Sequence, residues 1–351
     1  MQLYDKDLLS VQEVRELVDK AKTAQLELGN KNQKEVDQIV RSIAYAGVRN
    51  AKRLAELACE ETGFGLVADK IIKNVFASRG VYEHIKDMNT IGEIAWDEEK
   101  QVRSYAIPVG VIAGIIPSTN PTSTTLYKAE IAIKAGNAIV FSPHPSALSC
   151  IIETVKVIRQ AIAEAGGDEN LVSCITIPTM QATENLMKHS DISMILATGG
   201  SAMVRAAYSS GTPAIGVGPG NGPAYIEKTA NLETAVKCIM DSKTFDNGTI
   251  CASEQSVICD ENMAGDVQKE MERQGAYFLN ELERKKLGDF ILRANGTMNP
   301  MIVGKSVQVI ADLAEIQVPD YARVLVAHED GVGRGHPYSN EKLAPILAFY
   351  T

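Results

Sequence analysis

The strongest constraint on the fold is a strict alternation of apolar runs and helical segments between residues 109 and 217. The runs are 109–116, 138–141, 171–177, 192–197 and 214–217, and the helical segments between them are 121–135, 146–165, 181–188 and 201–209. Continuous apolar runs are typical of strands buried on both faces, and intervening helices supply the crossovers of a parallel sheet. The pattern therefore predicts a doubly wound α/β domain.

The flanking segments extend this prediction. Two amphipathic helices come first: one starts at a capping box formed by Ser10 and Glu13, and the other spans residues 33–62. The mixed segment 92–107 predicts an antiparallel hairpin that projects and pairs subunits. Past a helix at 232–245, a second alternation from Ser256 predicts a second α/β domain. It ends inside a strand at residues 348–351, so the second domain is expected to be incomplete.

Composition narrows the class of partner. The 351 residues suit two domains, here 1–230 and 231–351, and the net charge of -9 opposes binding to a nucleic acid. No apolar stretch is long enough to enter a membrane. The six cysteines show neither CxxC pairs nor zinc-like spacing. This favours a reduced, cytoplasmic protein without a metal site.

One cysteine stands apart from the others. Cys251 lies in the polar, glycine-containing loop 242–255 between a helix and a strand. Such a position is open to substrate, and nearby backbone amides favour the thiolate, which makes Cys251 a candidate nucleophile. The remaining cysteines lie in predicted helices or apolar strands and are expected to be packed; they are Cys59, Cys150, Cys174, Cys238 and Cys259.

Two strand ends carry further candidates. Asn120 follows a strand and precedes Pro121, so it is either a helix N-cap or an amide donor to an oxyanion. Gly199, Gly200 and Ser201 end a strand and open a helix, which is a typical seat for a pyrophosphate. This glycine pair is not the GxGxxG fingerprint, so by itself it is a weak signal.

Taken together, these segments resemble the aldehyde dehydrogenase superfamily. Within it they resemble the CoA-acylating branch, which includes the acetaldehyde dehydrogenase half of bifunctional aldehyde-alcohol dehydrogenases. The resemblance rests on residues 61–65, 117–123, 141–145, 197–200, 216–221 and 245–255. It implies that Cys251 carries an acyl thioester, that Asn120 holds the oxyanion and that NAD accepts the hydride. Residues 1–230 would then be the NAD-binding domain and 231–351 the catalytic domain.

The resemblance also implies a set of cofactor-binding residues. Ser142, Pro143 and His144 would lie near the adenosine ribose, Gly199, Gly200 and Ser201 near the pyrophosphate, and Glu341 near the nicotinamide ribose; Pro117 and Gly218 complete the set. Ser142 stands where many hydrolytic members have a lysine, so NAD is expected rather than NADP.

The same resemblance predicts the acyl acceptor. Hydrolytic members carry a water-activating glutamate in the segment that matches 216–221, where this chain has Val217, or Gly216 one residue earlier. Without that base we expect coenzyme A to take the acyl group, in both directions, from a short-chain aldehyde such as acetaldehyde. The alternatives are a hydrolytic enzyme that forms a carboxylate and a non-catalytic assembly module. A homo-oligomer is expected, alone or within a larger aldehyde-alcohol dehydrogenase or metabolic assembly.

Overall fold

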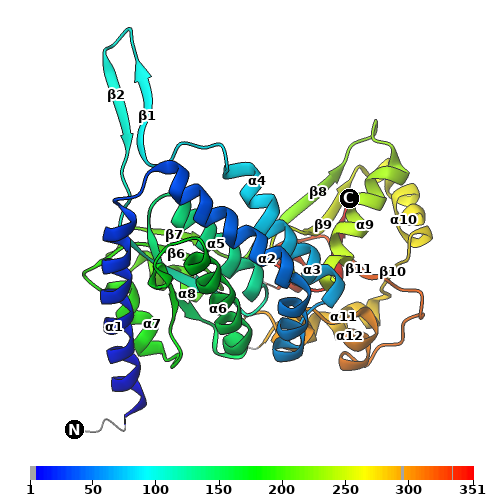
Figure 1. Cartoon of the computed structure of the whole chain (residues 1–351). Helices are drawn as coiled ribbons and strands as arrows, with labels where there is room; N and C mark the ends of the chain where they lie inside the picture. Colours follow the sequence, from blue (N-terminus) through cyan, green and yellow to red (C-terminus); the bar gives the residue numbers. More distant parts are fainter. Residues whose placement is uncertain (1–4, 294–295, 334) are drawn as a thin grey trace. The chain divides into compact units, whose positions relative to one another are not determined.

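Packing divides the chain into two units. The computed structural model describes residues 5–293, 296–333 and 335–351. The first unit comprises the chain up to Thr62 and residues 70–218, and the second comprises 63–69 and 219–351 (Figure 1). This division follows packing alone, so the assignment of 1–230 to NAD binding and of 231–351 to catalysis stays a prediction.

The first unit contains the predicted parallel sheet, with the strand order β5-β4-β3-β6-β7. Its strands are β3 (Val111–Ile116), β4 (Ala138–Pro143), β5 (Val172–Cys174), β6 (Ile192–Thr198) and β7 (Ala214–Val217), and every pair is parallel. The strand order grows away from β3 in both directions. Right-handed crossovers then require helices on both faces, which confirms the doubly wound prediction.

Two groups of helices cover this sheet. In one, α2 (Gln33–Thr62), α5 (Pro121–Lys134) and α6 (Leu148–Glu164) pack on one another; in the other, α1 (Lys6–Leu28) packs on α7 (Met180–Lys188). A shorter helix, α8 (Ser201–Tyr208), packs on β6 and β7. The strands and both groups share one buried apolar core. The bounds of α2 confirm the second predicted helix.

The predicted start of the first helix was wrong. Helix α1 begins at Lys6, and the Asp5 carboxylate caps it by accepting hydrogen bonds from the N–H groups of Asp7 and Leu8, at 2.9 and 3.0 Å. Ser10 is fully buried one turn further on, and its hydroxyl donates to the carbonyl of Asp7. The helix starts one turn earlier because Asp5 is also a favoured N-cap residue and its carboxylate takes the first N–H groups.

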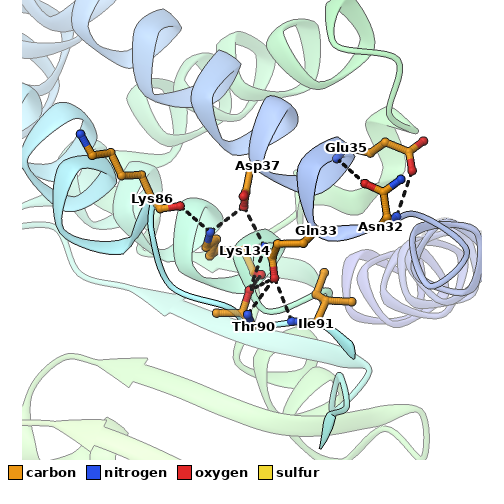
Figure 2. Close-up of polar contacts among 8 residues, drawn as sticks. All are labelled: Asn32, Gln33, Glu35, Asp37, Lys86, Thr90, Ile91 and Lys134. Carbon is orange, nitrogen blue, oxygen red and sulfur yellow. Dashed lines mark hydrogen bonds and ion pairs between the residues drawn. The ribbon is translucent and has the colours of Figure 1, made fainter. Parts of the chain in front are cut away.

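The start of α2 is tied to the chain that leads into the hairpin (Figure 2). Asn32 and Glu35 cap the helix reciprocally, each side chain accepting a hydrogen bond from the other residue's N–H. The Gln33 side-chain oxygen accepts hydrogen bonds from the N–H groups of Thr90 and Ile91, at 2.8 and 3.0 Å. Backbone groups that lack a sheet partner are thereby satisfied next to the hairpin.

Lys134 completes this network at the end of α5. Its ammonium is almost fully buried and contacts the Asp37 carboxylate at 2.5 Å and the Lys86 carbonyl at 3.0 Å (Figure 2). The predicted hairpin follows as β1 (Gly92–Asp97) and β2 (Val102–Ala106), which pair antiparallel. The base of the hairpin is therefore fixed to two helices of the first unit.

Three further helical segments lie between α2 and the hairpin. They are α3 (Val67–Val75), a π-helical turn η1 (Phe76–Gly80) and α4 (Val81–Ile85). The π-helical turn packs tightly on α2, because a Cβ at Gly47 would lie 2.2 Å from the Ser78 hydroxyl. A glycine in α2 thus permits a backbone approach that other residues would prevent.

The second unit is also built on a parallel sheet, with the order β10-β11-β12-β9-β8. The strands are β8 (Gly222–Ile226), β9 (Glu254–Cys259), β10 (Ala276–Phe278), β11 (Val324–His328) and β12 (Ile346–Tyr350). Alternate residues of β11 and β12 enter two separate cores, one with α9 (Leu232–Thr244) and α10 (Ala264–Arg273), the other with α11 (Glu281–Ile291) and α12 (Val307–Leu313). Both faces of the sheet are therefore covered.

The prediction for this unit was incomplete, since it lacked β8, β10 and α12. Within the described ranges, no helix has both the length and the apolar character needed to cross a lipid bilayer.

Candidate active site

The first unit gathers most of the predicted cofactor residues along one edge of its sheet. The strand order reverses beside β3, and ligands of doubly wound sheets bind outside the carboxyl ends of the strands at such a point. Pro117 follows β3, Pro143 ends β4, Gly199 follows β6 and Gly218 follows β7. Parallel pairing brings these positions to the same edge.

A lysine that the sequence reasoning missed braces the two central strand ends. The ammonium of Lys128, from α5, donates to the carbonyls of Ile115 and Leu196 at 2.9 and 2.8 Å. Burial lowers the pKa of Lys128 to about 7. These bonds satisfy carbonyls at the ends of β3 and β6 and hold the edge where the strands diverge.

The glycine turn after β6 is unobstructed at Gly200. The Gly199 N–H donates to the Val217 carbonyl at 3.1 Å, and extended Gly200 forms the N-cap of α8. A Cβ added at Gly200 would meet no atom within 4 Å, and Ser201, the first helical residue, is exposed. An unobstructed turn ahead of a helix start fits the diphosphate of a dinucleotide.

Strand β4 ends with Ser142 and Pro143, and His144 follows it. The Ser142 side chain is buried and shares a 2.8 Å hydrogen bond with the hydroxyl of Thr183, and Pro143 is buried as well. His144 is exposed, and its Nδ1 accepts a hydrogen bond from the Ser146 N–H. Of the three predicted residues, only His144 has its side chain at the surface.

Asn120 lies at the N-cap position of α5, with Pro121 as the first helical residue, but its side chain makes no capping hydrogen bond. Its Oδ1 instead accepts a hydrogen bond from the Lys73 ammonium at 2.8 Å. The capping alternative is therefore wrong for the side chain. The sequence reasoning missed Lys73, because nothing local links these two positions.

In the second unit, an unusual backbone precedes Cys251. The turn η4 (Phe245–Gly248) contains Asp246 and Asn247 at φ 52° and 51°, and Gly248 at φ 71°. Asparagine and aspartate tolerate this left-handed region better than other residues with side chains. Three such residues in a row persist only where their surroundings hold them.

Asp246 supplies much of that hold. It is fully buried, its N–H donates to the Asp69 carboxylate at 2.6 Å, and its own carboxylate accepts the Leu66 N–H at 2.7 Å. A Cβ at Gly65, where φ is +74°, would lie 1.9 Å from Asp246 Oδ1. This explains the glycine-rich segment 63–65, which provides the surface on which the cysteine loop rests.

The next two residues are held from another side. The Asn247 side-chain amide donates to the Gly304 carbonyl at 3.0 Å. A Cβ at Gly248 would lie 2.7 Å from the carbonyl carbon of Ala344. We call these contacts of residues 246–248 the clamp. Cys251 is exposed three residues after Gly248.

Exposure separates the cysteines, all six of which are free thiols. Cys150, Cys174 and Cys259 are buried, and burial raises the pKa of each thiol. Cys59 is half-buried. Cys238 lies on α9 as predicted but is exposed, so the expectation that it is packed was wrong. Of the two exposed cysteines, only Cys251 follows a clamped loop.

Glu341 contacts the segment that adjoins this loop. Its carboxylate accepts the Gly220 N–H at 2.9 Å, and a Cβ at Gly220 would lie 2.2 Å from the Cys251 carbonyl oxygen. Burial raises the pKa of Glu341, and the hydrogen bond from Gly220 offsets part of this shift. Gly220 thus contacts both the Glu341 carboxylate and the backbone of Cys251, the candidate nucleophile.

Two fully buried lysines lie behind the loop, and the sequence reasoning missed both. The Gln255 side-chain oxygen accepts from the Lys243 ammonium at 3.2 Å and from the Lys342 N–H at 3.0 Å. Burial lowers the pKa of Lys243 to about 7 and that of Lys342 well below its usual value. The only hint in the sequence was that Gln255 ends the cysteine motif.

One unit thus carries an open glycine turn and an asparagine at the strand ends of a doubly wound sheet, and the other carries an exposed cysteine on a clamped loop. This combination defines a class of two-unit α/β proteins with a dinucleotide-type edge and a candidate thiol nucleophile. The model of the aldehyde dehydrogenase family matches residues 3–341, and the chain belongs to this family.

Three relatives illustrate the branch within the family. An acetylating aldehyde dehydrogenase from Geobacillus thermoglucosidasius is 55% identical, with a TM-score of 0.97 over 99% of this chain and 77% of that one. The bifunctional aldehyde-alcohol dehydrogenase of Escherichia coli K12 is 43% identical over 97% of this chain and 38% of its own length. A propionaldehyde dehydrogenase from Rhodopseudomonas palustris with bound propionyl-CoA is 30% identical, with a TM-score of 0.86 over 96% of this chain and 74% of that one. The chain therefore spans about two-fifths of the bifunctional relative.

Proposed function

We propose that this chain performs CoA-acylating aldehyde oxidation: a short-chain aldehyde, with acetaldehyde favoured, becomes acyl-CoA through a thioester on Cys251, and acyl-CoA is reduced in reverse. The observation that carries the proposal is the exposed Cys251 on its clamped loop, in a chain whose segment 216–221 lacks the glutamate of hydrolytic members. The acylating and CoA-bound relatives support the same reaction.

The proposed chemistry begins at the Cys251 sulfur. Its thiolate attacks the aldehyde carbon, and the negative charge that develops on the carbonyl oxygen is stabilised by the Asn120 side-chain amide. NAD, when bound, supplies the hydride acceptor that converts this adduct to the thioester. The CoA thiolate then attacks the thioester carbon, and acyl-CoA leaves as the Cys251 thiolate is restored.

The acyl acceptor follows from residues 216 and 217. Val217 is 45% exposed at the end of β7, whereas a Cβ at Gly216 would lie 2.6 Å from Val204. No carboxylate side chain therefore activates water from either position.

Val217→Glu should introduce hydrolysis, measured as carboxylate released without CoA, because only position 217 has room for the side chain. If Val217→Glu forms no more carboxylate than Val217→Gln, the proposed reason for CoA acylation is wrong.

We propose NAD as the cofactor and the cytoplasm as the location. The open turn at Gly200, the exposed His144 and the helix start at Ser201 support a dinucleotide. Six free thiols suit a reducing compartment. Calorimetric titration with NAD and NADP tests the choice between the two cofactors, and tighter binding of NADP would overturn it.

We also propose that the hairpin assembles subunits into a homo-oligomer, alone or within a larger aldehyde-alcohol dehydrogenase. Its side chains Ile94, Trp96, Val102 and Tyr105 are 42–57% exposed, which is unusual for apolar residues on one projecting element. The network around Gln33 and Lys134 holds its base (Figure 2). Val102→Glu should lower the mass measured by light scattering, and an unchanged mass would contradict this role.

Cys251→Ala tests the central proposal. It should abolish both NADH formation from acetaldehyde and CoA and the reverse reduction of acetyl-CoA, while calorimetric binding of NAD is retained. Cys238→Ala is the matched control, since it removes the other exposed thiol. Undiminished turnover in Cys251→Ala would remove this cysteine from the mechanism. Equal carboxylate formation with and without CoA in the unaltered protein would instead favour the hydrolytic alternative.

A further inference from the structure

The contact between Lys73 and Asn120 fixes which way the asparagine amide faces. A lysine ammonium has three donors and no acceptor, so it bonds only to the amide oxygen. The 2.8 Å contact joins Lys73 Nζ to Asn120 Oδ1. The amide N–H2 group, on the other side of the same carbon, therefore points away from Lys73.

This direction decides whether Asn120 serves an oxyanion. With its N–H2 group presented, the side chain donates to developing negative charge; rotated by half a turn, it would present an oxygen lone pair that repels the charge. One preorganised donor is worth about 10²–10³-fold in rate. The two orientations have the same shape, so steric packing alone distinguishes them poorly, whereas a cation distinguishes them strongly.

Lys73 is itself held in place. The next residue, Asn74, is fully buried; its amide donates to the Ala51 carbonyl of α2 at 3.0 Å and its oxygen accepts the Thr122 hydroxyl of α5 at 2.8 Å. One turn earlier, the Lys70 ammonium donates to the Thr119 carbonyl at 3.1 Å. The helical segment that carries Lys73 is thus tied to the turn that carries Asn120.

We propose that Lys73 is a positioning residue that orients the Asn120 amide with its N–H2 group toward the oxyanion of the Cys251 adduct. The proposal rests on the oxyanion role of Asn120 in the proposed function. Lys73 acts through Asn120, so its effect should vanish once the amide is gone.

The test compares two reactions of Cys251 that both proceed without NAD. Acylation by acetyl-CoA passes through a tetrahedral oxyanion, whereas alkylation by iodoacetamide displaces iodide and forms none. Both are followed by intact-protein mass spectrometry in a Cys238→Ala background, which leaves one exposed thiol. Lys73→Glu places a hydrogen-bond acceptor where the lysine donates, and this should slow acylation about 10²-fold. Alkylation should remain within about twofold, and Lys73→Arg should acylate within about threefold of the parent.

Controls separate this effect from others. Lys52→Glu changes the same charge on an exposed part of α2 and should leave both rates unchanged. If thermal denaturation shows that Lys73→Glu is unfolded, Lys73→Met replaces it in the test. Acylation of the Lys73→Met variant should fall about tenfold, because the preference for one amide orientation is lost. In an Asn120→Ala background, neither substitution at Lys73 should slow acylation further.

The outcomes distinguish the two proposals. If Asn120→Ala acylates at the parent rate, the oxyanion role of Asn120 fails, and the proposed function loses that residue. If Asn120→Ala is slow but the Lys73 variants acylate normally, or if they add to its effect, the positioning role of Lys73 is wrong. A parallel loss of alkylation would likewise contradict it, since the cysteine itself would then have changed.

Discussion

In the first unit the candidate residues follow strand ends directly, whereas in the second the candidate nucleophile precedes its strand and depends on segments far away in the chain. Asn120 and Gly199 come within a few residues of β3 and β6. Cys251 comes before β9, after a turn whose Asp246 is held by residues 66 and 69. The first unit thus positions its candidate residues at the ends of its strands, whereas the second positions Cys251 through the clamp.

Breaking the clamp should have the largest effect. Gly65→Ala places a methyl group where Asp246 Oδ1 lies 1.9 Å away, at a backbone φ of +74°. The loop must shift, and a displacement of about 1 Å lowers the rate of a positioned reaction about 10²-fold. We expect this loss in acetyl-CoA acylation of Cys251, measured by mass spectrometry, with calorimetric NAD binding unchanged.

Gly166→Ala is the control for backbone strain alone. Its φ of +77° is nearly the same, but a Cβ there would meet no atom within 4 Å. It should cost about 1 kcal/mol of stability and leave acylation unchanged. Equal losses in the two variants would contradict the importance of the contact with Asp246.

The same contrast explains what the sequence revealed. The strands of the first unit are continuous apolar runs, and each was predicted at its place in the chain, although the run predicted at 171–177 forms only the short strand β5. Strand β8 was missed because Gly222 and Pro223 carry no strand pattern. Asn120 and Cys251 were recognisable from their local segments. Lys73 and the clamp were not, since their partners lie 47 residues away in one case and 180 in the other. Side-chain periodicity carries no information about such contacts.

Two buried titratable groups, Glu130 in the first unit and Lys243 in the second, should make stability depend on pH in opposite directions. In α5 of the first unit, both carboxylate oxygens of Glu130 are buried without a hydrogen-bond partner among the described residues, and burial raises its pKa to about 9. Between pH 4.5 and 9 the folded chain keeps a proton that the unfolded chain loses. The stability contributed by this position therefore falls as pH rises through this window, by roughly 1 kcal/mol per pH unit.

Glu130→Gln should remove this slope, so that the variant gains on the parent protein between pH 5 and pH 8. Urea unfolding followed by circular dichroism measures the difference. Glu56→Gln, at an exposed position of α2, should leave the slope as it is. A parent protein whose stability does not fall over this range relative to Glu130→Gln would show that Glu130 is ionised when folded.

Lys243 in the second unit should act in the opposite direction. Burial lowers its pKa from 10.5 to about 7, so between these values the unfolded chain binds the extra proton. Stability contributed by this position rises with pH across that window, on the order of 1 kcal/mol per pH unit. The Gln255 hydrogen bond makes the net effect of substitution smaller than that at Glu130.

Lys243→Met should therefore be most favourable, relative to the parent protein, near pH 7 and least favourable near pH 10, as read from unfolding curves. Lys237→Met, on the same helix but exposed, is the matched control and should show no such trend. A pH-independent difference between Lys243→Met and the parent protein would mean that Lys243 keeps its proton throughout.

The smallest effect is expected at Glu61, where the first unit uses a long-range contact of its own. The N-cap residue of α6, Ala147, has no capping side chain, and the Glu61 carboxylate accepts the N–H groups of Ser149 and Cys150 instead, both at 2.8 Å. Burial alone would raise the pKa of Glu61, but these two hydrogen bonds outweigh it and lower the pKa. The 61–65 segment thus has two roles: the Glu61 carboxylate caps α6, and Gly65 packs against Asp246.

Glu61→Gln keeps one acceptor but loses the charge at the helix N-terminus, which should cost about 1 kcal/mol, or about 2–4 °C in Tm. Because the folded pKa is depressed, the stabilisation is present above pH 4.5 and disappears as pH falls through the folded value, so the variant and the parent protein should converge in acid. Glu153→Gln removes two surface ion pairs from the same helix, with Arg53 and with Lys156, and should change Tm less. A loss of acylation in Glu61→Gln as large as in Gly65→Ala would show that the two units are not separately held, and that the contrast between topology and clamp is wrong.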